Sequence, residues 1–263
     1  MTGAADTDNA PPGVLPQGLR DQVFAKRQAA VGDFRFDEQV AQVFSDMIQR
    51  SVPGYGTIVS MMSVFADHFV QANTCVYDLG SSLGACSFAV LDGIGDREAN
   101  IVAVDNSPAM VERLNQQIEA RQQQTPSVAQ ISTVLSDLCN VPMNNASMVI
   151  LNFTLQFVPL AMRDGLIQSI YNGLNPGGAL VISEKLAFTD EHFDASMIHF
   201  HHDFKRANGY SDLEISQKRE ALDNVLLPES REAHIRRLKL AGFAQADVWF
   251  QCFNFASLIA IKS

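Results

Sequence analysis

The stretch that decides the fold is VYDLGSSLGA, Val76 to Ala85, in which a short apolar run ends in an aspartate and a glycine loop. Within it, GSSLG matches G-x-S-x-G, the nucleophile elbow of serine hydrolases, with Ser82 as the nucleophile. The same residues also match a glycine loop that opens a helix, where backbone amides can hold a nucleotide-like ligand. The rest of the chain must decide between a serine that reacts and a loop that binds.

Segments around this loop alternate between strand and helix. Apolar runs that end in polar residues predict strands at 74–80, 100–107, 130–137, 147–154 and 178–185. Helices are expected between them, and one of these has Ser107 at its N-cap and Pro108 at its first position. This alternation predicts a parallel, doubly wound α/β sheet.

The end of the chain departs from the alternation. DVWFQCFNFASLIAIKS, residues 247–263, holds two β-runs that are separated only near Asn254. That break is too short for a crossover helix, so the two strands are expected to pair antiparallel. A mostly parallel seven-stranded sheet with a C-terminal antiparallel hairpin resembles the Rossmann-like class I S-adenosylmethionine (SAM) methyltransferase fold.

We expect a single SAM-binding α/β domain over residues 33–263, preceded by a mobile N-terminal tail over residues 1–32. The tail is rich in Ala, Asp, Gly, Pro and Gln, and a short helix is expected near Leu19–Ala29. Two helices are expected before the first strand. A polar helical insertion is expected at about residues 190–226, before the final hairpin.

Composition argues against several classes of function. The net charge of −10 disfavours direct nucleic-acid binding, which needs a basic surface. No apolar run approaches the ~18 residues of a membrane span, and the first residues lack the apolar core of a signal peptide. The four cysteines form no C-x-x-C pair, so neither a zinc ribbon nor a redox dithiol is expected. We therefore expect a cytoplasmic protein without membrane association or a metal.

The elbow interpretation of Ser82 lacks its partners. Oxyanion donors would come from an upstream strand, and the sequence has no evident strand before Cys75. As a cofactor loop, Gly80 and Gly84 let amides approach a ligand. Asp105, at the end of the next strand, can accept both hydroxyls of a ribose. A carboxylate at the end of the first strand would repel a pyrophosphate, so we favour a nucleoside without phosphates, with SAM as the leading candidate.

Two further strand ends carry polar residues. Asp137 would place a carboxylate where the adenine amino group needs an acceptor, although a strand-end turn cap is the alternative. Asn152 ends the fourth strand, where folds of this kind place the reacting group, and a turn-making asparagine is the alternative. The sequence alone leaves both alternatives open.

Seven segments between Phe36 and Lys262 make the resemblance specific. They are FDEQVAQVFSDMIQRSVPGY, VYDLGSSLGA, DNSPAMVER, NASMVILNFTLQF, GLNPGGALVISEK, HHDFKRANGYSDLEISQKR and DVWFQCFNFASLIAIK. In this order they resemble the carboxy-S-adenosylmethionine (carboxy-SAM) synthase family over most of the chain. One departure is Ser81, where the family sequence DLGCSLGA has a cysteine. Serine and cysteine are close in size, so we expect little effect.

The resemblance implies a transferase that converts SAM and prephenate to carboxy-SAM and phenylpyruvate. It also implies a homodimer whose product supplies a carboxymethyl group to a partner enzyme that modifies the wobble uridine of certain tRNAs. Carried over by motif, the residues implied to contact SAM or carboxy-SAM are Tyr55, Gly80, Ser81, Ser82, Asp105, Asn106, Asp137, Leu138, Asn152 and Arg219.

Arg219 is implied to hold the carboxylate that distinguishes carboxy-SAM from SAM. A guanidinium offers a planar fork that binds a carboxylate with two hydrogen bonds, a contact worth roughly 1.5–3 kcal/mol. Without the resemblance, Arg219 would be interpreted as an exposed helix charge. Lys205, Arg206 and Lys218 are nearby cations that could hold the dicarboxylate prephenate.

No general base is assigned from the sequence. In the reaction that the resemblance implies, hydroxide released from prephenate removes the methyl proton, and His201 or His202 is the candidate if a side chain is needed. Two other functions stay open: a SAM-dependent methyltransferase of a small molecule, and a SAM-binding protein without catalysis. The sequence separates them only through Arg219 and the segment KRANGYSDLEISQKR.

Overall fold

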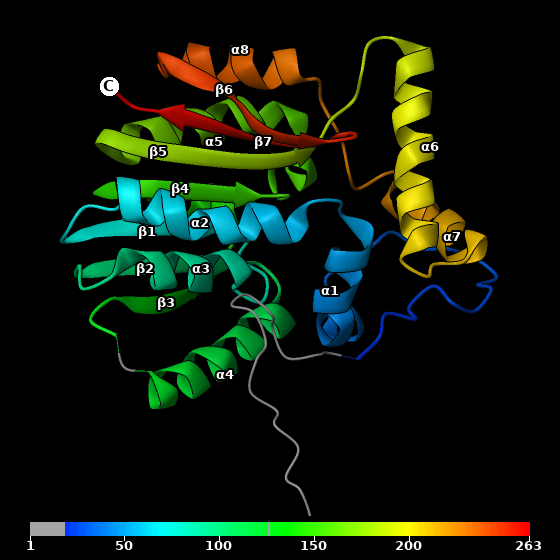
Figure 1. The fold of residues 1–263 in the computed structure, drawn as a ribbon, viewed down its shortest axis with the longest axis horizontal. Coiled ribbons are helices and arrows are strands. Elements are labelled where there is room, and N and C mark those ends of the chain that lie inside the picture. Colours follow the sequence, from blue (N-terminus) through cyan, green and yellow to red (C-terminus); the bar gives the residue numbers. More distant parts are fainter. Residues whose placement is uncertain (1–18, 126) are drawn as a thin grey trace, which may run out of the picture.

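A computed structural model describes residues 19–125 and 127–263. Within this part of the chain, seven strands form one sheet in the order β3-β2-β1-β4-β5-β7-β6 (Figure 1). The first five strands in this order, β3, β2, β1, β4 and β5, pair in parallel with their neighbours, whereas β7 runs antiparallel to both β5 and β6. The strands are β1 Thr74–Leu79, β2 Ala99–Asp105, β3 Gln130–Leu135, β4 Ala146–Asn152, β5 Leu174–Lys185, β6 Gln245–Cys252 and β7 Phe255–Ile261. The expected mostly parallel sheet with its C-terminal hairpin is confirmed.

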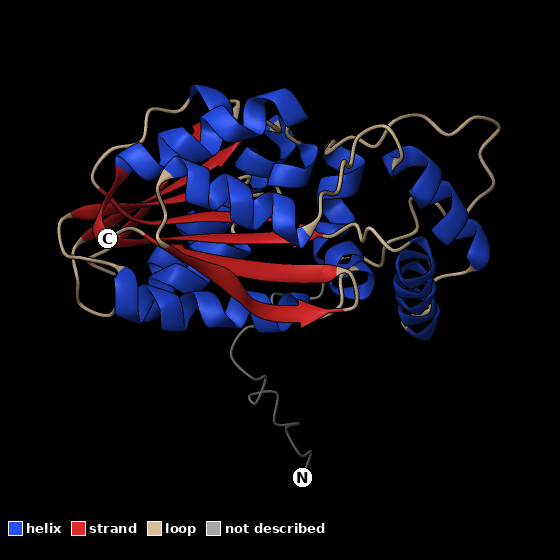
Figure 2. Cartoon of the chain, turned by 90° about the horizontal axis from the view of Figure 1, so that it is seen from above, coloured by secondary structure: helices blue, strands red, loops and turns tan. Residues whose placement is uncertain are grey.

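Helices cover both faces of the sheet (Figure 2). The helices are α1 Glu38–Ser51, α2 Tyr55–Phe69, α3 Ala85–Ile94, α4 Pro108–Gln124, α5 Leu160–Gly173, α6 Glu191–Ala207, α7 Asp212–Leu222 and α8 Arg231–Ala241. α2, α3 and α4 pack on one face, and α5 and α8 pack on the other. α1, α6 and α7 lie beyond the carboxyl ends of the parallel strands (Figure 1).

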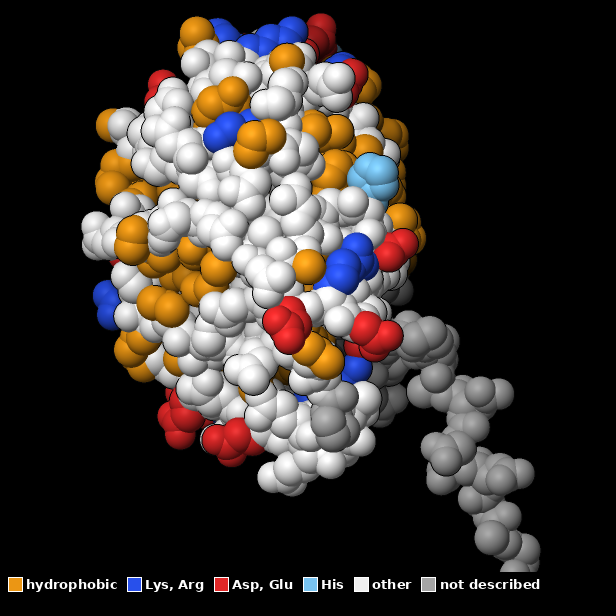
Figure 3. Space-filling view, turned by 90° about the vertical axis from the view of Figure 1, so that its left-hand side faces the viewer, with side chains coloured by type: hydrophobic (Ala, Val, Ile, Leu, Met, Phe, Trp, Pro, Cys, Tyr) orange, Lys and Arg blue, Asp and Glu red, His pale blue; other side chains and the backbone are white. Residues whose placement is uncertain are grey.

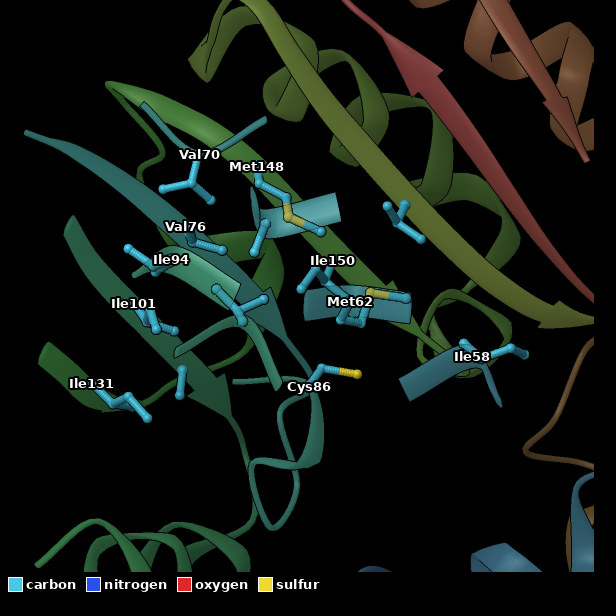
Figure 4. Close-up of a cluster of buried hydrophobic side chains, with 14 of the residues drawn as sticks. Ile58, Met62, Val70, Val76, Cys86, Ile94, Ile101, Ile131, Met148 and Ile150 are labelled. Carbon is cyan, nitrogen blue, oxygen red and sulfur yellow. The ribbon is translucent and has the colours of Figure 1, made fainter. Parts of the chain in front are cut away.

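Side chains of each strand alternate between two hydrophobic cores. Val76 of β1 and Ile150 of β4 pack in one core with Ile58 and Met62 of α2 (Figure 4). The intervening residues of the same strands face α5 and α8. Each fully buried side chain of this kind contributes roughly 1.5–3 kcal/mol. The two cores make the sheet a rigid platform for the loops at its ends.

The strand order reverses at β1. Helix α3 leads from β1 to β2 on one side, while β4 lies on the other side of β1. Open α/β sheets bind ligands at such a switch, in the crevice beyond the carboxyl ends of the strands. The glycine loop, Asp105 and Asn152 follow or end β1, β2 and β4, which places all three at this crevice.

The expected helical insertion consists of α6 and α7. Asp190 caps α6 by accepting a hydrogen bond from the Phe193 amide (2.8 Å), and Ser211 and Glu214 form a capping box at the start of α7. The chain turns between the two helices at Gly209, whose φ of 82° is in the left-handed region. These local signals set where α6 and α7 begin and where the chain turns between them. Both helices lie beyond the carboxyl end of the sheet, next to α1 (Figure 1).

Residues 19–36, termed the N-terminal strap, lie against α1 and α7. Asp21 is 2% exposed, and its Oδ2 accepts a hydrogen bond from the Tyr210 hydroxyl (2.6 Å). Phe24 is also buried, and Gln217 of α7 donates a hydrogen bond to the Phe24 carbonyl (2.8 Å). These contacts tie the strap to the helix that carries Lys218 and Arg219.

The strap differs from the mobile tail expected over residues 1–32. The segment Leu19–Ala29 forms turns, and no helix is present there. Its partners lie far along the chain, as the 189 positions between Asp21 and Tyr210 show, so no local pattern reveals them. The rest of the expected tail, residues 1–18, lies outside the residues that the structure describes.

The amino ends of the parallel strands form the opposite end of the molecule (Figure 3). Basic and acidic side chains stand there in small separate groups among hydrophobic ones. No helix in the described ranges is long and apolar enough to cross a lipid bilayer. In the same ranges, no group of three or more His, Cys, Asp or Glu side chains is placed to hold a metal ion.

Candidate active site

A cavity of about 640 Å³ lies at the carboxyl ends of the parallel strands. Its volume falls within the roughly 300–1,000 Å³ that small-molecule sites occupy. The wall includes residues of α1, α2, α6 and α7 and of the ends of several strands. All ten residues singled out from the sequence line it: Tyr55, Gly80, Ser81, Ser82, Asp105, Asn106, Asp137, Leu138, Asn152 and Arg219. The fold therefore brings these residues together around one space.

Backbone geometry holds the loop after β1. Gly80 and Gly84 have φ values of 78° and 79°, in the left-handed region that L-residues rarely adopt. A Cβ on Gly80 would lie 2.4 Å from side-chain atoms of Thr154, so this position also lacks space for one. The amides of Gly80 and Ser81 donate to the Val104 carbonyl (2.8 and 2.9 Å). The loop is thus fixed against β2 by the chain itself.

Ser82 is not arranged as a nucleophile. Its amide donates to Asp105 Oδ2 (2.8 Å), and its hydroxyl is directed to Met110 Sδ (3.4 Å). No histidine of residues 19–125 or 127–263 forms a hydrogen bond with Ser82. His201, which lines the same cavity, instead contacts the Ser51 carbonyl (2.8 Å). The hydrolase interpretation of GSSLG therefore lacks its base.

A buried carboxylate, Asp78, and a half-buried one, Asp105, mark the end of the cavity next to the glycine loop. Burial raises the pKa of Asp78 to about 6, while the Ser87 hydroxyl donates to Asp78 Oδ2 (2.6 Å) and opposes the shift. Burial also raises the pKa of Asp105, and the amides of Ser107 and Ser82 oppose it by donating to its two oxygens (2.9 and 2.8 Å). When ionised, these carboxylates attract a cation and accept hydrogen bonds from hydroxyl groups.

Two polar atoms in the wall, Ser81 Oγ and Asn152 Oδ1, are buried and have no hydrogen-bond partner in the described part of the chain. A buried polar atom without a partner costs about 1–3 kcal/mol, so native proteins rarely leave one. A polar ligand would supply the missing partners. The acidic side chains, the two partnerless atoms and the cavity volume together fit a nucleoside with a cationic amino-acid arm, as SAM has.

Tyr55 and Asp137 extend this end of the cavity. Burial raises the pKa of the Tyr55 phenol, so the hydroxyl stays protonated and can donate a hydrogen bond. Asp137 is exposed, and its Oδ1 caps the short 3-10 helix Leu138–Asn140 by accepting from the Cys139 amide (2.8 Å). This contact is the strand-end turn cap that the sequence analysis gave as the alternative role of Asp137. As an exposed carboxylate, Asp137 can accept a further hydrogen bond from a ligand.

The other end of the cavity is basic. Lys185 ends β5, Lys205 lies on α6, and Lys218 and Arg219 lie on α7. Burial lowers the pKa of Lys205 to about 7 and that of Lys218 to about 8. Arg219 is exposed, and no ion pair joins it to another residue of the described ranges. Its guanidinium can therefore take a carboxylate ligand.

Two cations lie where the sequence analysis did not place them. Lys185 was missed, although it ends a strand like other residues of the site, and that signal could have found it. Arg206 was considered with Lys205 as a cation for prephenate, but it does not line the cavity. It forms ion pairs with Asp203 and Asp212 (2.6 and 2.8 Å). Successive residues of a helix point about 100° apart, so only Lys205 of this neighbouring pair reaches the cavity.

Comparison with known proteins places the chain in a family. Residues 76–178 match a family model described as a methyltransferase domain. A carboxy-S-adenosyl-L-methionine synthase of Klebsiella pneumoniae subsp. pneumoniae is 53% identical over 244 residues, 93% of this chain and 97% of that protein. One of Yersinia pestis is 53% identical over 255 residues, 97% of this chain and 93% of that protein. The chain belongs to the carboxy-S-adenosyl-L-methionine synthase family.

Distantly related proteins of solved structure share the fold of this carboxy-SAM synthase family member. Human N-acetylserotonin methyltransferase, solved in complex with SAM, matches with a TM-score of 0.58 at 15% identity, over 86% of this chain and 55% of that one. An O-methyltransferase family protein from Burkholderia thailandensis matches with a TM-score of 0.59 at 19% identity, over 87% of this chain and 61% of that one. Together with the strand order, these matches confirm the class I methyltransferase fold. Family membership makes the protein a SAM-dependent transferase.

Proposed function

We propose that this carboxy-SAM synthase family member carboxylates the sulfonium methyl group of SAM, with prephenate as the carboxyl donor and phenylpyruvate as the second product. The observation that carries the proposal is one cavity with two kinds of charge. Asp78 and Asp105 lie at the end that fits SAM, and Arg219 lies at the basic end. Methyl transfer to a neutral acceptor would not need the basic end. The name of the curated relatives supports the same product.

The reaction balances without any further reactant. The bond between the ring of prephenate and one carboxylate breaks, and its electron pair makes the ring aromatic as hydroxide leaves. The hydroxide takes a proton from the methyl group and becomes water, and the methyl carbon bonds to the released CO2. SAM supplies the positive sulfur, which stabilises negative charge on that carbon.

The residues of the chain act in this proposal by holding groups and excluding water. Asp105 accepts the ribose hydroxyls, and Ser81 and Asn152 supply polar partners to the rest of SAM. The guanidinium of Arg219 binds the new carboxylate with two hydrogen bonds. Fixed charges act more strongly in a cavity that holds little water than in bulk solvent. The chain therefore contributes position and charge.

No histidine of the cavity is needed as the base. His201 is 6% exposed, and burial lowers its pKa to about 2, so the ring is neutral with Nε2–H donating to the Ser51 carbonyl. Burial, followed by the charge of Lys205, also lowers the pKa of His202. Both imidazoles are thus neutral near pH 7 and add no positive charge to the basic end.

We further propose that carboxy-SAM passes to a second enzyme, which uses its carboxymethyl group to modify a tRNA wobble uridine. The net charge of −10 supports a role without direct contact to the tRNA. A homodimer and a cytoplasmic location belong to the same proposal, and both rest on the family resemblance.

The proposal is tested by incubating the purified protein with SAM and prephenate. Mass spectrometry should find a nucleoside product heavier than SAM by one CO2, with phenylpyruvate formed in equal amount. A reaction without prephenate is the control and should give neither product. Methylation of an added acceptor without this mass gain would replace the proposal with an ordinary methyltransferase.

A further inference from the structure

Four cations share the basic end of the cavity: Lys185, Lys205, Lys218 and Arg219. Lys205 and Lys218 are only 6% and 7% exposed. Within residues 19–125 and 127–263, none of the four forms an ion pair with a carboxylate. Buried ions are normally paired, because taking an ion out of water is costly. The unpaired lysines therefore indicate that the cavity takes up an anion.

The protein compensates these charges only in part. Asp21 of the strap favours the charged form of both Lys205 and Lys218, and Asp46, which pairs with Arg50 (2.9 Å), also favours that of Lys218. Its oxygens already accept hydrogen bonds from the Tyr210 hydroxyl (2.6 Å) and the Val23 amide (3.1 Å). One buried carboxylate with two such partners cannot neutralise two lysines on its own. Asp194 and Asp223 favour the charged form of Lys185, but in the described ranges no carboxylate forms an ion pair with any of the four cations.

The four cations fall into two pairs. Lys205 and Lys218 are buried, whereas Lys185 is half-buried and Arg219 is exposed. The cation that most lowers the pKa of Lys205 is Lys218, followed by Lys185, and the cation that most lowers the pKa of Lys185 is Arg219. Lys218 donates a hydrogen bond to the Ser51 hydroxyl (3.0 Å), and the remaining N–H groups of its ammonium can bind a ligand. Each pair provides enough donors for one carboxylate. The basic end therefore fits a dianion with two separate carboxylates better than it fits a single carboxylate.

We propose that Lys205 and Lys218 form a second carboxylate site, which holds the carboxylate of the donor that stays on the product. The carboxylate that is transferred lies instead at Lys185 and Arg219, where the carboxylate of carboxy-SAM is held. This inference rests on the proposed function and assigns each carboxylate of the dianionic donor to its own pair. A donor with a single carboxylate leaves one pair of cations without a partner, so the site selects dicarboxylates.

The test compares Lys205→Met and Lys218→Met with the wild-type protein. In either variant the KM for prephenate should rise about tenfold or more, because a charge-assisted contact is lost. The affinity for carboxy-SAM, measured by calorimetry, should change by less than about threefold, because its carboxylate contacts the other pair. Lys205→Arg, which keeps the charge, should recover much of the lost affinity.

Arg206→Met is the matched control, because Arg206 neighbours Lys205 but pairs outside the cavity. Thermal unfolding and S-adenosylhomocysteine binding verify that each variant is folded. An active wild-type protein with unchanged KM in both lysine variants would overturn this inference and leave the proposed function intact. A wild-type protein that makes no carboxy-SAM would overturn the proposed function instead. Equal losses for prephenate and carboxy-SAM would show one shared carboxylate site and also overturn the inference.

The pH dependence of the KM for prephenate tests the same site. The dianion binds the charged lysines, whose pKa values in the free cavity are about 7 for Lys205 and about 8 for Lys218. The KM for prephenate should therefore rise from about pH 7 to about pH 9, with little change in kcat. The charged or titratable groups that face the two lysines are Asp21, Asp46, Arg50, Lys185, His201, His202 and Tyr210. Lys205→Met should remove the part of the rise near pH 7, and a flat KM profile would contradict the proposal.

Discussion

At the scale of single residues, Arg219 should separate carboxy-SAM from its uncarboxylated relatives. Arg219→Ala removes a guanidinium that lines the cavity and has no ion pair in the described ranges. Carboxy-SAM affinity should fall about tenfold to 150-fold, the value of a charge-assisted contact. S-adenosylhomocysteine has no such carboxylate, so its affinity should change by less than about threefold. Calorimetry measures both, with Arg206→Ala as the control; equal losses would contradict the carboxylate role.

Ser82 should tolerate loss of its hydroxyl. Its amide, which alanine keeps, makes the hydrogen bond to Asp105, whereas its hydroxyl only meets the weakly accepting sulfur of Met110. Ser82→Ala should therefore fold normally and keep turnover within about tenfold, with at most weaker SAM binding. Steady-state kinetics and thermal unfolding measure the outcome. Complete loss of turnover with intact SAM binding would revive the nucleophile elbow.

Sequence patterns located those site residues that end strands. Asp105, Asp137 and Asn152 could be placed at one crevice because the carboxyl ends of parallel strands share one edge. Lys205 and Lys218 could only be named as neighbours of Arg219, because their burial depends on how α6 and α7 pack. The pattern also offered no reason to prefer Lys205 over Arg206, since the facing side of a helix is fixed by tertiary contacts.

At the scale of elements, the strap should control the position of α7. Gln217 of α7 donates to the carbonyls of Phe24 and Lys26 (2.8 and 3.0 Å) and accepts from the Gln28 amide (2.7 Å). Gln217→Leu leaves these backbone groups without partners, at a cost of about 1–3 kcal/mol. The unfolding temperature should fall by several degrees. Carboxy-SAM affinity should fall more than S-adenosylhomocysteine affinity, because Arg219 shares the helix with Gln217.

Thermal unfolding and calorimetry of Gln217→Leu provide these measurements. Gln42→Leu is the matched control, since Gln42 is exposed on α1 and its side chain bonds only to Glu38 within that helix (3.2 Å). A lower unfolding temperature with unchanged ratio of the two affinities would show that the strap stabilises the fold without positioning α7.

The order of elements was predictable, and the strap was not. Strict alternation of strand and helix followed by a short final break left few topologies, because crossovers between parallel strands need a helix and a hairpin does not. The strap has no regular period, and its hydrogen bonds with α7 span 187 to 193 positions in the chain. A pattern within a short stretch of sequence indicates only local structure. It therefore cannot predict a segment that is ordered by contacts with residues far along the chain.

At the scale of the whole molecule, the opposite charges at the two ends of the cavity determine how charged ligands are oriented in it. Carboxylates from the ends of β1 and β2 and cations from β5, α6 and α7 line one space. A positively charged sulfur held near the first group lowers the free energy of an anion near the second. Linkage requires the anion to favour the sulfonium ligand by the same factor.

The two ligands should therefore bind cooperatively without any movement of the chain. Saturating succinate, an unreactive dicarboxylate, should raise the affinity for SAM more than that for S-adenosylhomocysteine, which lacks the sulfonium charge. Calorimetric titrations of both ligands with and without succinate measure these changes in affinity. Added salt should weaken the effect of succinate on SAM affinity less than it weakens an ion pair at the protein surface. If succinate changes the affinities for SAM and S-adenosylhomocysteine equally, the sulfonium charge and the dicarboxylate do not interact, and the predicted cooperativity is wrong. A static arrangement of side chains thus sets which ligand combinations fill the cavity together.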